Sequence, residues 1–305
     1  RWYPTRLILL GHGETSIIET IVELEQSCPE LIIQPVIADI SNYEHLNTIL
    51  KRYQPQVIFH AAAHKHVPLM QANIEEAIFN NVLGTQNLVN AAIDNNIERL
   101  VMISTDKAIC PTSVYGATKR IGEMLVINSA RRTGKSYSVV RFGNVLGSRG
   151  SVVLRFKHQI NTGGPFTITH PDMQRYFMTI PEAVHLVLQA FAMGKGGEVF
   201  VLNMGDQIRI LDLAQDLIRL SGLEPGKDIE IIYTGIRPGE KLKEALWDEG
   251  ANYQPTAHPD VLRLDEEETQ SSQVLQETVQ ELIELASLHD PEAIVHLLNK
   301  TIPGA

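Results

Sequence analysis

The chain has 305 residues, which is enough for one large domain or for two domains. It carries 26 basic and 36 acidic residues, and the formal net charge of −10 argues against a nucleic acid or an anionic membrane as the main partner. At 44% hydrophobic residues it is too apolar for disorder, yet no uncharged apolar run approaches the ~18 residues of a membrane helix. Two cysteines exclude a disulfide framework and are typical of a reducing compartment.

Short aliphatic runs alternate with longer amphipathic stretches over the first two-thirds of the sequence, which predicts βαβ units around a parallel sheet. The predicted strands are residues 7–10, 32–37, 57–59, 100–103, 137–140 and 198–202. The predicted helices are residues 15–27, 43–52, 73–95, 115–132 and 182–193. Beyond residue 205 the pattern is mixed, with helices at 211–221 and 274–288 and a strand at 229–233. Ligands of such sheets bind at the carboxyl ends of the strands, so the polar residues there are candidate site residues.

Tyr115 and Lys119 lie four positions apart on a predicted helix and therefore share a face. A phenol has a pKa near ~10, but a neighbouring ammonium favours the phenolate. The pair thus suits removal of a proton from an alcohol while hydride leaves the same carbon. By itself this spacing is more typical of an exposed helix face.

Other strand ends strengthen the functional interpretation. Ser104 and Thr105 follow the strand before this helix, and Asp39 follows an earlier strand, where a carboxylate can accept from an adenine amine. Small side chains at 61–63 would let a dinucleotide approach the backbone. This combination resembles the extended short-chain dehydrogenase/reductases.

Within that superfamily, residues 7–246 resemble the UDP-N-acetylglucosamine 4,6-dehydratases of bacterial polysaccharide and glycan biosynthesis. The motifs are HAAAHKHVP at 60–68, NVLGT at 81–85, STDK at 104–107, YGATK at 115–119, RFGNVLGSRGS at 141–151, MQR at 173–175 and RPGEKL at 237–242. The resemblance implies an α/β fold with a Rossmann-type doubly wound parallel sheet and a smaller C-terminal α/β domain. The implied division is an NADP-binding domain at residues 1–147 plus 181–204 and a nucleotide-sugar domain at 148–180 plus 205–305.

The resemblance also implies a catalytic role for each residue of the Ser-Thr-Asp-Lys and Tyr-x-x-x-Lys motifs. Tyr115, assisted by Lys119, takes the proton of the sugar 4-hydroxyl, which Thr105 orients, as hydride passes from C4 to NADP. Lys107 removes the C5 proton, provided that a neighbouring cation and partial burial keep its amine neutral. Asp106 protonates the departing 6-hydroxyl. The alternative for Asp106 and Lys107 is a solvated ion pair at a strand end.

Binding residues follow from the same motifs. The expected cofactor contacts are His12, Glu14, Asp39, Ile40, Ala61, Ala62, Ala63, Asn81, Ser104, Tyr115, Lys119 and Val145. The expected contacts of the UDP-N-acetylhexosamine are Lys65, Asn144, Arg149, Arg175, Arg209, Arg237 and Glu240, among which the arginines suit a diphosphate. A surface role for Arg209 and a helix-packing role for Asn81 are alternatives. No metal is expected, because the histidines at 60, 64 and 66 lack a carboxylate at ligand spacing.

One departure concerns the front of the fold. The sequence contains no Gly-x-x-Gly-x-x-Gly phosphate loop, and Gly11-His12-Gly13-Glu14 matches the loop after the second family strand instead. Gly11 replaces a frequent acidic ribose ligand, which favours NADP over NAD. The chain is therefore expected to lack the first βα unit, with Arg1 as a cut edge. We expect a cytoplasmic homo-oligomer, either free or as the soluble part of a membrane-anchored protein.

Two alternatives to the dehydratase remain open at this point. One is a nucleotide-sugar 4-epimerase or a 5-epimerase-type enzyme on the same scaffold. Simple 4-epimerisation needs no base at C5 and should survive Lys107→Ala. The other is a non-catalytic UDP-sugar-binding remnant, which should bind the nucleotide sugar but not NADP.

Overall fold

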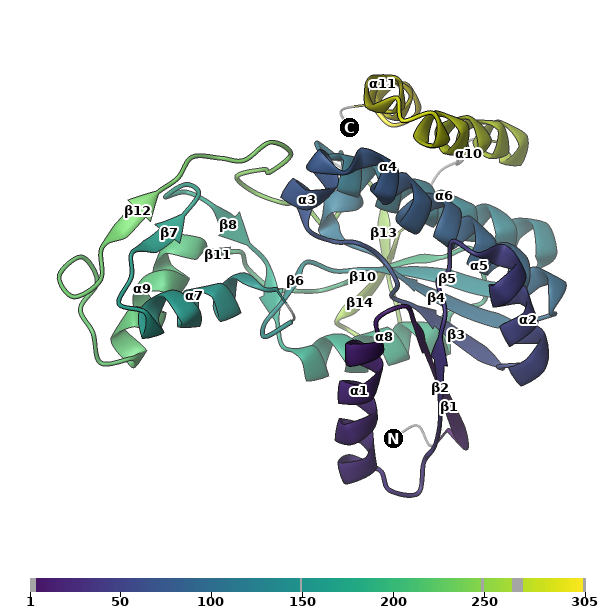
Figure 1. Ribbon diagram of the computed structural model, residues 1–305, viewed down its shortest axis with the longest axis horizontal. Helices are drawn as coiled ribbons and strands as arrows, with labels where there is room; N and C mark the ends of the chain where they lie inside the picture. Colours follow the sequence, from purple (N-terminus) through teal and green to yellow (C-terminus); the bar gives the residue numbers. More distant parts are fainter. Residues whose placement is uncertain (1–3, 149, 248–249, 265–270, 304–305) are drawn as a thin grey trace.

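The computed structural model describes residues 4–148, 150–247, 250–264 and 271–303. A central sheet lies between helices, and a smaller lobe extends to one side (Figure 1). The sheet has the strand order β13-β14-β10-β5-β4-β3, in which β3, β4, β5 and β10 are parallel neighbours and β14 runs antiparallel to β10 and β13. Its strands are β3 (Val57–His60), β4 (Arg99–Ile103), β5 (Ser136–Arg141), β10 (Val199–Leu202), β13 (Tyr253–Pro255) and β14 (Val261–Leu264).

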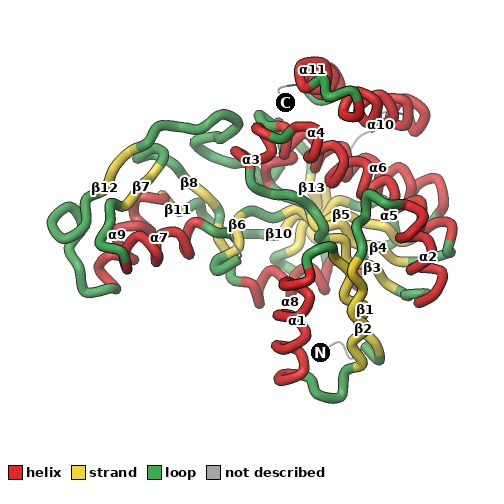
Figure 2. The backbone as a smooth tube through the Cα atoms, in the orientation of Figure 1, coloured by secondary structure: helices red, strands yellow, loops and turns green. Residues whose placement is uncertain are grey.

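Helices cover both faces of this sheet (Figure 2). On one face lie α2 (Tyr43–Tyr53), α3 (Val67–Ala72), α4 (Ile74–Ala77), α5 (Gly84–Asp94) and α6 (Val114–Thr133), and on the other α8 (Ile180–Met193). Leu100, Val139 and Val201 have no exposed surface. The continuous apolar runs of these strands are thus explained by burial on both faces, and the predicted parallel sheet is confirmed.

The first two strands form a parallel pair of their own. β1 (Arg6–Gly11) pairs with β2 (Ile32–Ile37), with α1 (Glu14–Ser27) as the crossover. Among the described residues no strand pairing joins this pair to β3. Phe59 on β3 is 46% exposed, and Ile32 and Ile37 on β2 are 59% and 58% exposed. The sheet is therefore interrupted beside β3, and the expectation of a missing first βα unit stays a prediction.

The smaller lobe has its own core. It contains α7 (Val152–Asn161), β7 (Phe166–Ile168), β8 (Gln174–Arg175), β11 (Ile208–Arg209), α9 (Ile210–Leu220) and β12 (Ile231–Tyr233). Phe156 and Phe166 stack at its centre with 4.1 Å between ring centroids, and Ile218 is fully buried beside them. A short parallel pair, β6 (Asn144–Val145) with β9 (Phe177–Met178), lies between this lobe and the sheet.

The predicted helix at 73–95 is interrupted in the structure. It consists of α4, a π-helical turn η1 (Ile78–Leu83) and α5. Within the turn, the Asn81 side chain is 1% exposed and bonds to the backbone of His64 and to the Thr118 hydroxyl. A π-turn adds a residue to the helical repeat, and here it carries the inward-facing amide.

A C-terminal helical hairpin covers the helix layer. It consists of α10 (Ser272–Ser287), which contains most of the predicted helix at 274–288, and α11 (Pro291–Thr301), and it lies over α4 and α6 (Figure 1). Leu275, Val279 and Leu282 share one buried cluster with Ile78 and Val82. No helix in the described part of the chain is long and apolar enough to cross a membrane.

The structure distributes the C-terminal residues differently from the predicted domain division. Residues 253–264 extend the central sheet, and residues 272–301 pack on its helix layer, although the sequence placed 205–305 with the substrate domain. The physical reason is that the apolar face of α10 matches an apolar face formed by α4, η1 and α6. Which two faces meet is decided by tertiary packing and not by the periodicity of either helix.

Truncation of Leu282 to alanine should destabilise the protein by about 3 kcal/mol, because the side chain is fully buried and leaves a cavity. Urea unfolding followed by circular dichroism measures this. Val274→Ala, at a position 48% exposed on the same helix, is the control and should change the unfolding free energy by less than about 1 kcal/mol. Equal losses in the two variants would contradict the packing described for α10.

Candidate active site

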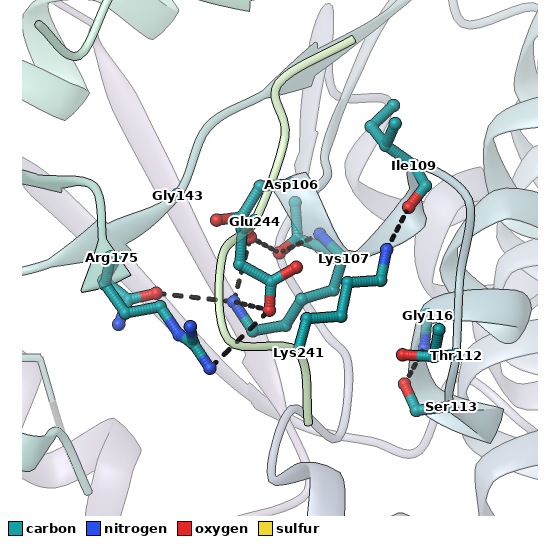
Figure 3. A network of polar contacts seen from close by, with 12 residues as sticks. Asp106, Lys107, Ile109, Thr112, Ser113, Gly116, Gly143, Arg175, Lys241 and Glu244 are labelled. Atoms are coloured by element: carbon teal, nitrogen blue, oxygen red, sulfur yellow. Dashed lines mark hydrogen bonds and ion pairs between the residues drawn. The ribbon is translucent and has the colours of Figure 1, made fainter. Parts of the chain in front are cut away.

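The residues predicted to be catalytic converge where β4 ends. The strand ends at Ile103, and Thr105 caps a single 3-10 turn, η2 (Asp106–Ala108). Asp106 and Lys107 begin this turn, which packs against α6 (Figure 3). The contact requires glycine at position 116, because a Cβ there would lie 2.3 Å from the Lys107 carbonyl oxygen. The turn and the first part of α6, which carries Tyr115, are thereby held in direct contact.

Tyr115 is a buried phenol in an acidic environment. Burial raises its pKa above the ordinary value, a hydrogen bond with the Thr105 side chain lowers it, and the charges of Asp106 and Glu244 raise it further. The sequence predicted the opposite direction, through the Lys119 ammonium. In the structure Lys119 Nζ donates to the Ile103 carbonyl at 2.8 Å. Burial is the largest cause of the raised pKa of Tyr115, and the nearby carboxylates add to it.

Lys107 lies among carboxylates and not beside a cation as the sequence argument required. Its Nζ is 2.9 Å from Asp106 Oδ1 and 3.8 Å from Glu244 Oε1, and it donates to Asn144 Oδ1 at 3.4 Å. Arg175 is the second cation of this group. Its Nη2 lies 3.9 Å from Glu244 Oε1, so its charge acts on Glu244, the carboxylate that it shares with Lys107 (Figure 3). Asp106 and Lys107 are therefore not a solvated pair, since Asp106 has no exposed surface.

Asp106 keeps one oxygen without a hydrogen-bond partner. Oδ1 accepts from the Thr105 hydroxyl at 2.9 Å as well as from Lys107, whereas Oδ2 is buried and unpartnered. A Cβ at position 143 would lie 2.9 Å from this Oδ2, so Gly143 of the Arg-Phe-Gly-Asn motif makes the close approach of strand end and turn possible.

A buried ion pair supports α6 one turn beyond Lys119. Glu123 and Arg141 have no exposed surface, and Arg141 Nε and Nη2 donate to the two carboxylate oxygens at 2.7 and 2.6 Å. Burial acts to raise the pKa of Glu123, but the Arg141 guanidinium outweighs it and lowers that pKa to about 2. Burial lowers the pKa of Lys119 to about 8, and the Glu123 charge partly opposes this.

The predicted cofactor contacts lie along successive strand ends. His12 follows β1, Asp39 follows β2, and residues 61–63 follow β3. Burial acts to raise the pKa of Asp39, but its bonds to Ser41 and the nearby His12 and His64 lower it overall. Exposure is highest at His12, Glu14, Asp39 and Ala61, and intermediate at Ala62, Ala63 and Val145.

Several predicted contacts are already occupied by protein groups. The Ser104 hydroxyl donates to Glu123 Oε1 at 2.6 Å, and the Asn81 amide bonds to His64 and Thr118. Ile40 belongs to the main core with 5% exposure, so its side chain packs inward. The side chains of these three residues are thus bonded or packed within the protein in this structure.

A carboxylate does lie beside one of the histidines, contrary to the argument from spacing. His64 Nε2 is 2.9 Å from Glu76 Oε1, because α4 folds back onto the loop after β3. His60 is buried behind this loop, where burial lowers its pKa to about 3, and it bonds to the Thr85 hydroxyl at 2.9 Å.

The predicted substrate contacts separate into two sets. Asn144 and Arg175 reach the Lys107 group, and Arg175 is 8% exposed because it also donates to the carbonyls of Gln174 and Leu242. Arg237 and Glu240 are partly buried on the segment that leads to Glu244, whereas Lys65 and Arg209 are exposed. Arg209 pairs with Asp172 and Asp212, which agrees with its surface alternative, and Arg149 lies outside the described residues.

Three residues of this site were not predicted from the sequence: Glu123, its partner Arg141, and Glu244. Glu123 was detectable, since it lies four residues after Lys119 on the same helix face. Glu244 follows the Arg-Pro-Gly-Glu-Lys-Leu block by two residues, but no local pattern brings it to Lys107 from 137 positions away.

The doubly wound sheet, with a Tyr-x-x-x-Lys helix packed beside the ends of its strands, defines a Rossmann-type extended short-chain dehydrogenase/reductase. Solved structures agree with this class. The X-ray structure of Pen from Bacillus thuringiensis superposes with a TM-score of 0.76 at 32% identity, covering 88% of this chain and 82% of that one. A dTDP-glucose 4,6-dehydratase, DesIV from Streptomyces venezuelae, shares the fold with a TM-score of 0.67 at 18% identity over 79% of this chain and 88% of that one.

The chain belongs to the polysaccharide biosynthesis protein family, whose profile matches residues 1–266. It is 55% identical over 245 residues to capsular polysaccharide biosynthesis protein CapD of Staphylococcus aureus and 51% identical over 244 residues to the probable polysaccharide biosynthesis protein EpsC of Bacillus subtilis (strain 168). Each match covers 80% of this chain and 41% of the relative, so the chain spans less than half the length of these relatives. A UDP-glucose 4-epimerase of Rickettsia canadensis (strain McKiel) is 39% identical over 215 residues, which are 69% of this chain and 60% of that one.

Replacement of Glu123 by glutamine should cost about 3 kcal/mol or more at pH 7, because it leaves the buried Arg141 without its counter-charge. The lowered pKa of Glu123 means that its stabilisation is complete above its ordinary value of 4.5 and is lost as the pH falls toward about 2. Urea unfolding between pH 7 and pH 3 should therefore show a steeper loss for the wild type than for E123Q. Glu98→Gln is the matched control, because the Glu98 carboxylate that pairs with Lys135 is exposed, and its effect should be at most about 1 kcal/mol.

Proposed function

We propose that this protein is a nicotinamide-dependent nucleotide-sugar 4,6-dehydratase that converts UDP-N-acetylglucosamine to a UDP-4-keto-6-deoxy-N-acetylhexosamine for polysaccharide or glycan synthesis. The observation that carries the proposal is the contact between η2 and α6. It gathers a phenol, a carboxyl group and an amine, Tyr115, Asp106 and Lys107, within one partly buried group. Dehydration needs these three proton-transfer groups.

The residues present fit the two ends of a dinucleotide. Lys119 is buried beside the end of β4, and His12 and Asp39 lie at strand ends where the adenosine would bind. The sequence contains no glycine-rich loop for the pyrophosphate. This chain therefore provides candidate contacts for the nicotinamide end and the adenosine end of the cofactor, but none for the pyrophosphate between them. The bound nicotinamide would accept hydride from C4 of the sugar and return it to C6.

The proton transfers can be assigned to this chain's own side chains. Tyr115, as the phenolate, takes the proton of the 4-hydroxyl, and Thr105, which already bonds to it, orients that hydroxyl. Lys107, as the neutral amine, takes the C5 proton that the 4-ketone makes acidic. Asp106 gives a proton to the 6-hydroxyl, which leaves as water, and Lys107 returns a proton to C5 when hydride reaches C6. Only the C5 proton is returned to the sugar. The proton that Tyr115 takes from the 4-hydroxyl balances the one that Asp106 gives to the 6-hydroxyl, so a proton passes from Tyr115 to Asp106 through solvent before the next turnover, and only water is lost.

The charges around Tyr115 bear on the first proton transfer. Tyr115 is surrounded by the negative charges of Asp106 and Glu244, which oppose the phenolate. The positive charge of an oxidised nicotinamide at this position would oppose that effect. We further propose NADP as the cofactor. Gly11 stands where an acidic ribose ligand is frequent, so no carboxylate at this position repels a 2′-phosphate. His12 and His64 lie close enough to Asp39 to lower its pKa, so two imidazoles lie at the end of the site where that phosphate would bind.

A 4-epimerase is the second candidate, and the Rickettsia canadensis relative supports it. Such a reaction uses the Tyr115 proton transfer and leaves Asp106 and Lys107 without a task. Asp106 is fully buried with one unpartnered oxygen, an arrangement that costs free energy unless a ligand group completes it. This favours dehydration over epimerisation.

Supplied with NADP and UDP-N-acetylglucosamine, the full-length gene product should release a nucleotide sugar lighter by the mass of one water. Mass spectrometry of the product checks this. In Lys107→Ala the dehydrated product should fall by about 100-fold or more, because the base at C5 is lost.

Tyr115→Phe should also lose the product, since oxidation at C4 comes first. A wild-type enzyme that changes only the C4 configuration, with activity retained in Lys107→Ala, would replace this proposal by the epimerase. Calorimetric binding of UDP-sugar without any binding of NADP would instead indicate the non-catalytic remnant.

A further inference from the structure

The buried carboxylate of Glu244 has no role in the reaction proposed above, although it lies against the residue assigned as base. We propose that Glu244 positions Lys107: together with Asp106 it holds the Lys107 amine between two carboxylates, and it sets the pH above which Lys107 accepts a proton. This rests on the proposed function, in which Lys107 is the base at C5.

Glu244 is a buried ion-pair partner of Lys107 and not a surface side chain. The Glu244 side chain is 3% exposed, and Oε1 lies 3.8 Å from Lys107 Nζ and 3.9 Å from Arg175 Nη2. Oε2 is buried without a hydrogen-bond partner. A buried carboxylate without compensating charge is costly, so its location between two cations is what makes its burial possible.

The segment that carries Glu244 is anchored on both sides of it. Lys241 Nζ donates to the Ile109 carbonyl at 2.8 Å, directly beyond η2 (Figure 3). The Leu242 carbonyl accepts from Gln174 N at 2.8 Å, and Leu246 is buried in the main core. These contacts fix the backbone on either side of Glu244 relative to η2, so the distance to Lys107 is set by the fold.

The charged groups that face Lys107 come from four elements. Asp106 lies on η2 itself, Glu244 on the anchored segment, Arg175 on β8 behind Glu244, and Tyr115 on α6. Asn144 on β6 adds a neutral acceptor at 3.4 Å. Two carboxylates thus act on the amine from different directions, and loss of either leaves Lys107 with one anchor and a weaker preference for the charged form.

The carboxylates of Asp106 and Glu244 hold the Lys107 amine at different stages of the reaction. Before it gives its proton to the leaving hydroxyl, Asp106 is a neutral carboxyl group and does not attract the Lys107 ammonium. It becomes a charged anchor for that ammonium only after the proton has left. Glu244 remains charged through that step, balanced by Arg175, and keeps the Lys107 Nζ in place to return its proton to C5. Glu244 is accordingly a positioning residue that acts through Lys107.

The test compares pH profiles of kcat and KM for dehydration by the wild type, Glu244→Gln and Glu244→Asp in the full-length protein. In E244Q the acid limb of the kcat profile should move to lower pH by about one unit, because a negative charge near the amine is removed. The plateau should fall about tenfold through the lost anchor, with KM unchanged within about twofold. In E244D the carboxylate is retained on a side chain shorter by one methylene group, so the acid limb of the kcat profile should move in the same direction but by less. Glu281→Gln on the exposed side of α10 is the control and should leave the profile unchanged.

A second readout does not depend on activity. Reductive methylation with ¹³C-formaldehyde and a borane reductant places labelled methyl groups on the lysine amines. Their NMR signals report the protonation of each amine, and the Lys107 resonance is identified by its absence in Lys107→Arg. The Lys107 titration midpoint should be lower in E244Q than in the wild type. If E244Q does not fold, the same comparison is made with E244D. An unchanged midpoint, or a rise in KM with an unshifted acid limb, would overturn the proposal. A lower Lys107 midpoint in E244Q, together with a wild type that forms no dehydrated product, would instead contradict the proposed function alone.

Discussion

The ion pair between Glu123 and Arg141 is the constraint on which the site depends. It joins α6 to β5, and the Ser104 hydroxyl extends it to the end of β4. Two opposite charges without exposed surface tolerate little displacement, because a broken buried pair leaves an uncompensated charge. Tyr115 and Lys119 lie on the same helix, two turns and one turn before Glu123, and the turn with Asp106 and Lys107 follows β4. One buried contact therefore sets the distance between the two candidate catalytic motifs.

A second constraint is charge balance in a confined volume. Asp106 and Glu244 contribute two negative charges, and Lys107 and Arg175 contribute two positive ones. Each carboxylate retains one buried oxygen without a partner, so the balance of charge is complete but the hydrogen bonding is not. An arrangement of this kind is stable enough to persist and still favours a ligand that supplies donors.

The helix layer over the sheet is itself enclosed by the C-terminal hairpin. Leu275, Val279 and Leu282 cover Ile78 and Val82 of the π-helical turn, and Tyr115 belongs to the same apolar cluster. The π-turn holds Asn81 against the backbone of His64, so the hairpin, the π-turn and the loop after β3 form one packed unit. Packing at the C-terminal end of the chain thus reaches the phenol, even though the family match ends at residue 266.

Local sequence determined most of the parallel sheet and the main candidate catalytic motifs, because apolar runs, helical spacing and strand-end polar residues are properties of neighbouring positions. Tyr115, Lys119, Asp106 and Lys107 could be found in this way. The sequence could not decide the sign of the electrostatics, since Tyr115 lies among carboxylates and Lys107 lacks the cation expected beside it. Nor could it place Glu244, the π-turn or the hairpin. Those features arise from contacts between residues far apart in the chain, where burial and charge are set by the tertiary structure alone.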